Sequence, residues 1–336
     1  METKIFNVDQ LEEAAKLITT GELVAFPTET VYGLGADALN SQAALSMFKA
    51  KGRPADNPLI VHVKEASEVE KIAYTNAEFH LLAERFWPGP LTMILPKKPI
   101  VPYETTGGLE TVAVRCPNHK IALRLIELAK TPIAAPSANR SGRPSPTEAK
   151  HVYEDLKGII AGIVDGGHTG IGLESTVLDL TGETPEILRP GGVTLEMLKV
   201  YLPQARQAVV KAGQKVKSPG LKYRHYAPKA PMYMVIGTPE EQIKEILLQL
   251  EKNGPNVGVL ATDESYHLYP TPYKISLGSR HDLAMIATNL YGALRYFDST
   301  NVKIIFAETI SGEGLATAIN DRLTRACGGQ RILAGH

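Results

Sequence analysis

Polar side chains gather at five points of the sequence, each at the end of a predicted strand. The first point is the stretch Phe26–Gly35, in which the hydroxyl residues Thr28, Thr30 and Tyr32 stand beside two glycines. Ligands of α/β proteins bind where strands end, so this stretch is a candidate binding loop. A turn that binds nothing is the alternative, and the sequence leaves both open.

The second point carries two cations, Lys51 and Arg53, on a loop that follows a predicted helix. The forked guanidinium and the point charge of an ammonium together suit a polyphosphate. Cations near the end of a helix can also simply complement its dipole. Asn57 lies in the same loop, and His62 sits in the next apolar strand, where a lone histidine more often has a structural role.

The third point is Arg115, which ends the apolar strand that begins at Thr111. Burying an arginine is costly without a partner, so we expect either an anionic ligand or an internal salt bridge. The remaining two loops span 134–147 and 165–176, and a second strand-end arginine, Arg189, follows them. Hydroxyl and amide groups in these loops are Ser137, Asn139, Ser145 and Ser175. Five such loops, three with Arg or Lys, indicate one shared anionic ligand.

Alternating helical and strand patterns predict the fold that positions these loops. Strands are expected at 23–26, 59–63, 91–95, 111–115, 132–135, 159–164, 176–180 and 186–188, with helices between most of them. This order predicts an α/β fold with a twisted, mixed N-terminal β-sheet flanked by helices. Three further strands with crossover helices predict a smaller, Rossmann-like C-terminal domain. We expect a catalytic domain at 1–204, a basic linker or flap at 205–230 and the second domain at 231–336.

Composition narrows the class of protein. Of 336 residues, 43% are hydrophobic and 21% charged, which is typical of a globular chain and excludes whole-chain disorder. Basic and acidic residues balance at 36 each, so overall charge gives no case for binding long nucleic acid. Two cysteines and the lack of a signal segment or long apolar run lead us to expect a cytoplasmic protein with no membrane role. Residues 201–230 hold seven basic and no acidic residues, which is typical of a linker or a solvated face but also suits contact with an anion.

The motifs together resemble those of the L-threonylcarbamoyladenylate synthase family, in its longer two-domain form. The matching segments are Pro27-Thr-Glu-Thr-Val-Tyr-Gly-Leu-Gly, Lys51-x-Arg53, Asn57-Pro-Leu, Trp87-Pro-Gly-Pro-Leu-Thr, Val112-Ala-Val-Arg-x-Pro, Pro136-Ser-Ala-Asn, Glu174-Ser-Thr-Val and Tyr223-Arg-His-Tyr-Ala-Pro. The resemblance is strong over 1–200 and looser over 215–336.

The resemblance implies a nucleotidyltransferase that makes threonylcarbamoyl-AMP and pyrophosphate from L-threonine, bicarbonate or CO2, and ATP with Mg²⁺. A tRNA threonylcarbamoyl transferase complex would receive the product and form N6-threonylcarbamoyladenosine beside the anticodon. Lys51 and Arg53 would be catalytic. The implied ATP-binding residues are Lys51, Arg53, Asn57, Ser137, Asn139, Ser145, Arg189 and Tyr226, and the implied threonine-binding residues are Thr28, His62, Thr111, Arg115 and Ser175.

The resemblance implies a more specific role for the basic linker. Residues 218–228 would form a flap over the ATP phosphates. A structured-RNA-binding module without ATP turnover is the main rival function, with weak tRNA contact left open. A carbamoyltransferase step and a degenerate scaffold are further rivals. The sequence indicates no general base, no metal-ligand set and no oligomeric state.

Overall fold

The computed structural model describes residues 2–209 and 226–335, which divide into two compact units. Unit 1 holds residues 2–141 and 145–209, and unit 2 holds residues 142–144 and 226–335. The basic linker predicted at 205–230 and the flap predicted at 218–228 fall largely on 210–225, outside the described residues. Among the helices of the described chain, none combines the length and apolar character needed to cross a membrane.

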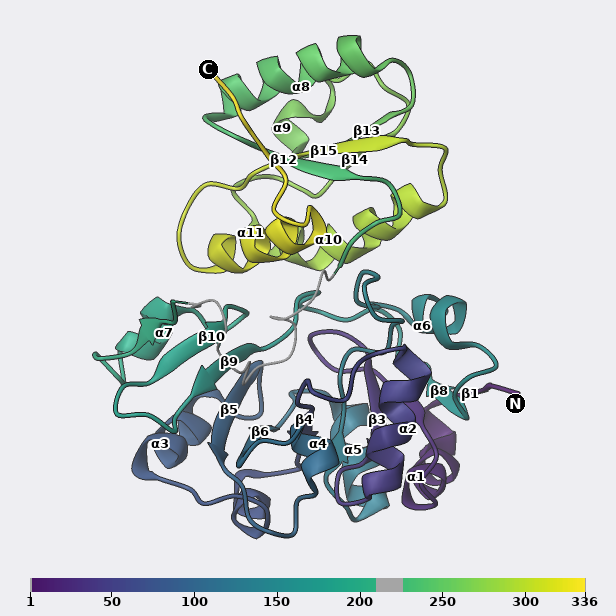
Figure 1. Ribbon diagram of the computed structural model, residues 1–336, viewed down its shortest axis with the longest axis vertical. Coiled ribbons are helices and arrows are strands. Elements are labelled where there is room, and N and C mark those ends of the chain that lie inside the picture. Colours follow the sequence, from purple (N-terminus) through teal and green to yellow (C-terminus); the bar gives the residue numbers. More distant parts are fainter. Residues whose placement is uncertain (1, 210–225, 336) are drawn as a thin grey trace. The chain divides into compact units, whose positions relative to one another are not determined.

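Unit 1 is built on an 11-stranded mixed sheet of order β1-β8-β2-β3-β7-β4-β6-β5-β9-β10-β11 (Figure 1). Its central strands β4 and β6 are parallel, while β7 and β5 run antiparallel to them on either side. The strands are β1 (Lys4–Phe6), β2 (Val24–Phe26), β3 (Gly33–Asp37), β4 (Ile60–His62), β5 (Leu91–Pro96), β6 (Thr111–Arg115), β7 (Ile133–Ala134), β8 (Gly162–Val164), β9 (Thr176–Asp179), β10 (Glu186–Arg189) and β11 (Arg206–Gln207). The predicted mixed α/β sheet is confirmed.

The α-helices of unit 1 are α1 (Leu11–Thr19), α2 (Ser41–Lys51), α3 (Ala77–Phe86), α4 (Tyr103–Thr106), α5 (Lys120–Ala129), α6 (Ala149–Leu156) and α7 (Leu195–Lys199). Helix α2 matters most for the site. It begins because the side chain of Asn40 accepts the backbone N–H groups of Gln42 and Ala43. It ends because Gly52 adopts the left-handed conformation, with φ of 61°. This C-terminal turn places Lys51 and Arg53 on either side of one glycine.

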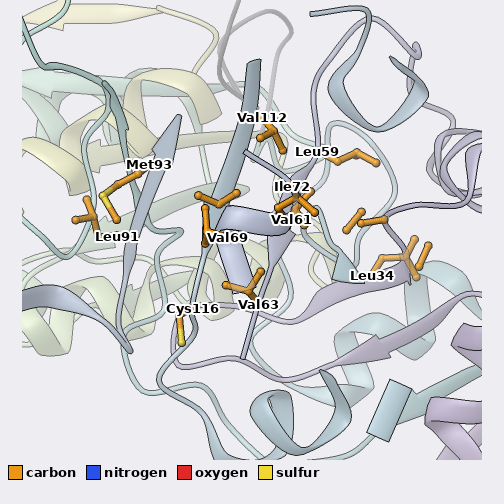
Figure 2. Packing of buried hydrophobic residues seen from close by; sticks show 14 of the residues in the cluster. Leu34, Leu59, Val61, Val63, Val69, Ile72, Leu91, Met93, Val112 and Cys116 are labelled. Carbon is orange, nitrogen blue, oxygen red and sulfur yellow. The ribbon is translucent and has the colours of Figure 1, made fainter. Parts of the chain in front are cut away.

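Alternation along the strands gives the unit 1 sheet two different faces. Figure 2 shows Val61, Met93 and Val112 among the side chains of the main apolar core. The neighbouring positions Ile60, Ile94 and Ala113 point to the opposite face, where they form a small apolar cluster with Val177. Thr111 and Arg115 share that second face with Ala113, because they stand two residues before and after it.

One predicted loop of unit 1 is wrong. Residues 26–35 were expected to form a loop, but Gly33–Asp37 is the strand β3, antiparallel to β2. Glycines are rare in strands, which is why the pattern hid it. Here Gly35 is required, since a Cβ at this position would lie 2.9 Å from the Phe26 ring and 3.0 Å from the Val24 carbonyl oxygen.

Unit 2 is a parallel sheet of order β14-β13-β15-β12-β16, with α8 and α9 on one face and α10 and α11 on the other (Figure 1). Its elements are β12 (Met232–Ile236), α8 (Pro239–Asn253), β13 (Val257–Ala261), α9 (Asp263–Tyr266), β14 (Lys274–Ser276), α10 (Leu283–Asp298), β15 (Ile304–Glu308), α11 (Leu315–Ala326) and β16 (Arg331–Leu333). The three predicted strands are present, and β14 and β16 are additional. Both extra strands are edge strands without a buried apolar run, so they carry no hydrophobic signal.

Candidate functional site

Lys51 is a buried ammonium held by main-chain oxygens. Its Nζ donates to the carbonyl oxygen of Asn139 at 2.6 Å and to that of Ser137, so the end of α2 and the loop after β7 are tied together. Burial, and next the positive charge of Arg53, hold the pKa of Lys51 well below its ordinary value. No carboxylate of the described residues forms an ion pair with this ammonium. An anionic ligand would therefore favour its charged form.

Arg53 and Asn57 meet in the loop that follows α2. The Arg53 Nη2 donates to the Asn57 carbonyl oxygen at 3.1 Å, and its guanidinium lies 5.8 Å from the centre of the Phe48 ring. The Asn57 side chain is 1% exposed, yet neither its amide oxygen nor its amide nitrogen has a hydrogen-bond partner among the described residues. A buried amide without partners costs free energy, and a bound ligand with donor and acceptor groups would recover it.

Arg115 lies buried beside a carboxylate that the sequence analysis did not select. Its Nη2 approaches the Glu29 Oε2 to 2.8 Å, while its Nε donates to the Gly89 carbonyl oxygen at 3.3 Å. The angle between the ion-pair partners is not that of a hydrogen bond, so the Nη2 and both Glu29 oxygens keep unused bonding capacity. Of the two expectations for Arg115, the internal salt bridge is present, and it leaves room for a ligand carboxylate.

His62 stands directly beside Arg115, because the parallel register of β4 and β6 pairs these two residues. Burial, and next the positive charge of Arg115, lower the pKa of His62 to about 3. The ring is therefore neutral at pH 7. Its Nδ1 has no hydrogen-bond partner among the described residues. His62 is thus a neutral polar group at the arginine end of the strand pair.

Thr111 lies at the other end of β6, roughly 13 Å along the strand from Arg115. Extending the register of Ile60 with Ala113 places Thr111 beside Pro58, next to Asn57. The structure therefore brings Thr111 toward the Asn57 end of the face and His62 toward the Arg115 end. The role of Thr111 in threonine binding stays a prediction.

Ser175 and Arg189 form a second polar group at the start of β9. The Arg189 Nη2 donates to the Ser175 carbonyl oxygen at 2.9 Å and to its Oγ at 3.2 Å. The Ser175 hydroxyl also lies 2.7 Å from that of Thr92 on β5. This group is close to Arg115, because Thr176 bonds to the carbonyl of Pro90 and Arg115 to that of Gly89.

Ser145 is fully buried and donates to the Glu174 Oε1 at 2.6 Å, which links the loops on which the two residues lie. Glu174 also acts on the pKa of Lys51, so Ser145, Glu174 and Lys51 are neighbours in unit 1. The hydroxyl of Thr28 is occupied locally, since it contacts the Thr30 hydroxyl at 2.8 Å and donates to the Val31 carbonyl oxygen at 2.7 Å.

Tyr226 belongs to unit 2. Its backbone has φ of 62°, and its ring lies 5.2 Å from that of Tyr291 and 5.7 Å from the Arg322 guanidinium. Its predicted contact with ATP stays a prediction.

Sequence reasoning missed Glu29 and Glu174 as functional candidates. Both lie in motifs that match the family, and the available signal was an acidic residue next to a hydroxyl residue: Glu29 lies between Thr28 and Thr30, and Glu174 precedes Ser175.

Unit 1 therefore has two linked polar groups: a cationic one around Lys51 and Arg53, and an arginine–histidine–carboxylate one around Arg115. These features define a class of α/β proteins whose cationic groups have the chemistry to accept a polyanion beside a small carboxylate. A family profile described as "Telomere recombination" (Sua5_yciO_yrdC) matches residues 16–191. A second, "Threonylcarbamoyl-AMP synthase, C-terminal domain", matches residues 193–328.

The chain belongs to the threonylcarbamoyl-AMP synthase family. It is 48% identical to the threonylcarbamoyl-AMP synthase of Bacillus subtilis (strain 168), covering 97% of this chain and 95% of that one. It is also 48% identical to that of Pyrococcus abyssi (strain GE5 / Orsay), covering 97% and 98%. The crystal structure of P. abyssi Sua5 complexed with L-threonine superposes with a TM-score of 0.93 at 46% identity, covering 99% of this chain and 100% of that one. The family resemblance is confirmed, and the chain is an enzyme of this kind.

Proposed function

We propose that the chain joins L-threonine, bicarbonate or CO2, and ATP into threonylcarbamoyl-AMP, releasing pyrophosphate. The observation that carries the proposal is the buried Lys51 ammonium, whose pKa is lowered and whose described partners are two neutral carbonyl groups. Such a cation favours a ligand that brings negative charge. The threonine complex of the P. abyssi relative supports the amino-acid half of the proposal.

The first step forms the carbamate of threonine. The uncharged amine nitrogen adds to the carbon of CO2, one C–O π bond becomes the carbamate negative charge, and the amine proton passes to water; from bicarbonate, the same bond formation releases one water molecule. The Arg115 guanidinium would bind the α-carboxylate, since it keeps bonding capacity beside Glu29. The neutral His62 ring and the Ser175 hydroxyl stand close to that fork and would orient the substrate. Because the pKa of His62 is about 3, we assign it hydrogen bonding rather than storage of the amine proton.

The second step is attack of a carbamate oxygen on the α-phosphorus of ATP. The bond between that phosphorus and the bridging oxygen breaks, and both electrons leave with pyrophosphate. Lys51 and Arg53 would stabilise the charge that develops on the leaving group, which is the main lever in phosphoryl chemistry. Asn57 with its unused amide, and the loops of Ser137, Asn139 and Ser145, would hold the rest of the nucleotide, with Arg189 beside them.

Mg²⁺ would arrive with ATP and neutralise part of the phosphate charge. The described residues contain no group of three or more His, Cys, Asp or Glu side chains that could hold a metal ion by themselves. This donor set fits Mg²⁺ bound mainly by substrate phosphates and water, which is its usual state in nucleotide enzymes. Glu174, next to Lys51, is a carboxylate that would assist.

We further propose a cytoplasmic enzyme whose product serves the N6-threonylcarbamoyladenosine modification of tRNA, through a separate transferase complex. The mixed anhydride of threonylcarbamoyl-AMP hydrolyses readily, which favours transfer close to where the compound is made. The test follows pyrophosphate release with ATP and Mg²⁺ while threonine, bicarbonate or both are omitted, and with L-serine in place of threonine. We expect release to need threonine and bicarbonate. Release without threonine would contradict the assigned amino-acid site.

A further inference from the structure

The sheet of unit 2 contains a point at which the chain changes direction. After β13 the chain moves outward to β14, whereas after β15 it passes over β12 to β16 on the other side. The carboxyl ends of the adjacent strands β13 and β15 therefore flank a topological switch point. In open parallel sheets this is the place where ligands bind.

A cavity of about 230 Å³ opens at this point. It lies entirely within unit 2, at the N-terminus of α8 and between the segments that follow β13, β14 and β15. Most of its lining residues carry a polar side chain: Gln242, Thr262, Arg280, His281, Glu308, Thr309 and Ser311. This is the composition of a binding site rather than of a packing defect, because empty defects in proteins are lined by apolar groups.

Glu308 forms the floor of the cavity, and its carboxylate is buried. It accepts hydrogen bonds from the backbone N–H and hydroxyl of Thr262 at 3.2 and 2.9 Å, from the Tyr269 hydroxyl at 2.6 Å, and from the Ser265 hydroxyl. Both carboxylate oxygens are thus occupied. These donors hold the carboxylate in one orientation, so its role is to position a neighbouring group.

That role is to hold Arg280. Its Nη2 donates to the Thr262 hydroxyl at 2.7 Å and lies 3.7 Å from the Glu308 Oε2. Its Nε contacts the Glu264 carboxylate at 3.3 Å. Burial alone raises the pKa of Glu264, but hydrogen bonds from Ser279 and the Arg280 backbone lower it to about 2, so this partner is charged at pH 7.

The remaining edge of the guanidinium is open. Nη1 of Arg280 donates no hydrogen bond to any residue that the structure describes, and the side chain is 23% exposed on the cavity wall. An arginine fixed on one edge and open on the other is preorganised for an anion. His281 and the hydroxyl of Ser311 line the same cavity.

We infer that this cavity is a second ligand site, which binds the carboxylate or phosphate group of a small metabolite through Arg280. The volume limits the ligand to about the size of an amino acid, because pockets for larger molecules begin at about 300 Å³. The inference goes beyond the proposed reaction and does not depend on it, since every lining residue belongs to unit 2.

The test is methyl NMR of the full-length protein with labelled isoleucine, because Ile310 is the isoleucine that lines the cavity. Inorganic phosphate and malonate are titrated separately. We expect a saturable shift of the Ile310 methyl with at least one of them: phosphate alone would identify a phosphate site, and malonate alone a carboxylate site. The absence of a saturable shift with both probes would overturn the inference.

Arg280→Gln removes the cation while Glu308 keeps its other donors, so we expect the fold to persist. The affinity for the bound probe should fall by about tenfold or more, since a charge-assisted bond is lost. Arg331→Gln changes an exposed arginine elsewhere in unit 2 and is the matched control, which should bind as the wild type does. Equal affinity in the wild type and Arg280→Gln would overturn the assignment, as would equal loss in both variants.

Discussion

Replacing Lys51 with methionine separates a structural role from a catalytic one. The ammonium donates to two carbonyl groups, and each such bond to a charged group contributes about 1.5–3 kcal/mol. Taking the charge out of water costs several kcal/mol, which offsets this gain. Methionine fills a similar volume without that cost. We therefore expect the free energy of unfolding to change by no more than about 2 kcal/mol.

Activity should respond far more strongly. A preorganised group that stabilises developing charge contributes about 10²–10³-fold in rate, so pyrophosphate release by Lys51→Met should fall by that factor. Lys49→Met, on the exposed face of the same helix, is the matched control and should retain normal turnover. Urea unfolding and a pyrophosphate-release assay measure the two effects. Turnover within tenfold of the wild type in Lys51→Met would refute the reasoning.

The lowered pKa of Lys51 adds a pH signature to the same comparison. The negative charge of a bound triphosphate favours the ammonium form and raises the pKa of Lys51 again, so ATP binding should be coupled to proton uptake at any pH where the empty site has begun to lose that proton. ATP affinity should therefore weaken as pH rises through the lowered pKa. Calorimetry in buffers of different ionisation enthalpy should show proton uptake in the wild type and less in Lys51→Met.

Three further predictions concern neighbouring residues. Arg115→Lys keeps the charge but loses the fork, so the KM for threonine should rise by about tenfold while that for ATP stays the same; an equal rise in both would contradict the assignment. Asn57→Leu removes a buried amide without described partners, so denaturation should show unchanged or up to about 2 kcal/mol higher stability, and calorimetry weaker ATP binding. The pKa of His62 is about 3 in the folded state against 6.5 in the unfolded state, so the unfolded chain takes up the proton first and stability falls as pH drops from 6.5 towards 3. The loss is about 3 kcal/mol at pH 4, and His62→Asn should abolish it in urea titrations at pH 4 and 7; an unchanged loss would refute the cause.

The parts of the fold that the sequence predicted are those with strong local signals. Helix α2 has a side-chain cap at Asn40 and a left-handed glycine at its end, and the strand from Thr111 to Arg115 is a short, almost wholly buried run centred on three apolar residues. The strand Gly33–Asp37 escaped prediction because its glycines are set by close contacts with Phe26 and Ile133, which are tertiary rather than local.

In the candidate site, too, the residues with a local sequence signal were predicted and those defined by tertiary contacts were not. The cations at 51, 53, 115 and 189 stood out because charged residues at strand and helix ends need a reason. The carboxylates that pair with site residues did not stand out, because their partners are distant in sequence. Glu29 pairs with Arg115 across 86 positions, and Glu174 pairs with Ser145 across 29. Such pairings depend on the order of strands in the sheet, which no periodicity encodes. The unpartnered amide of Asn57 is likewise visible only once its surroundings are known.

The most direct measurement of the central claim uses ¹³C-bicarbonate. The protein is incubated with ATP, Mg²⁺, L-threonine and the labelled bicarbonate, and the adenylate product is analysed at once by mass spectrometry. We predict threonylcarbamoyl-AMP carrying one ¹³C atom, formed together with pyrophosphate and absent when threonine is omitted. Unlabelled adenylate, or RNA binding with no adenylate at all, would contradict it.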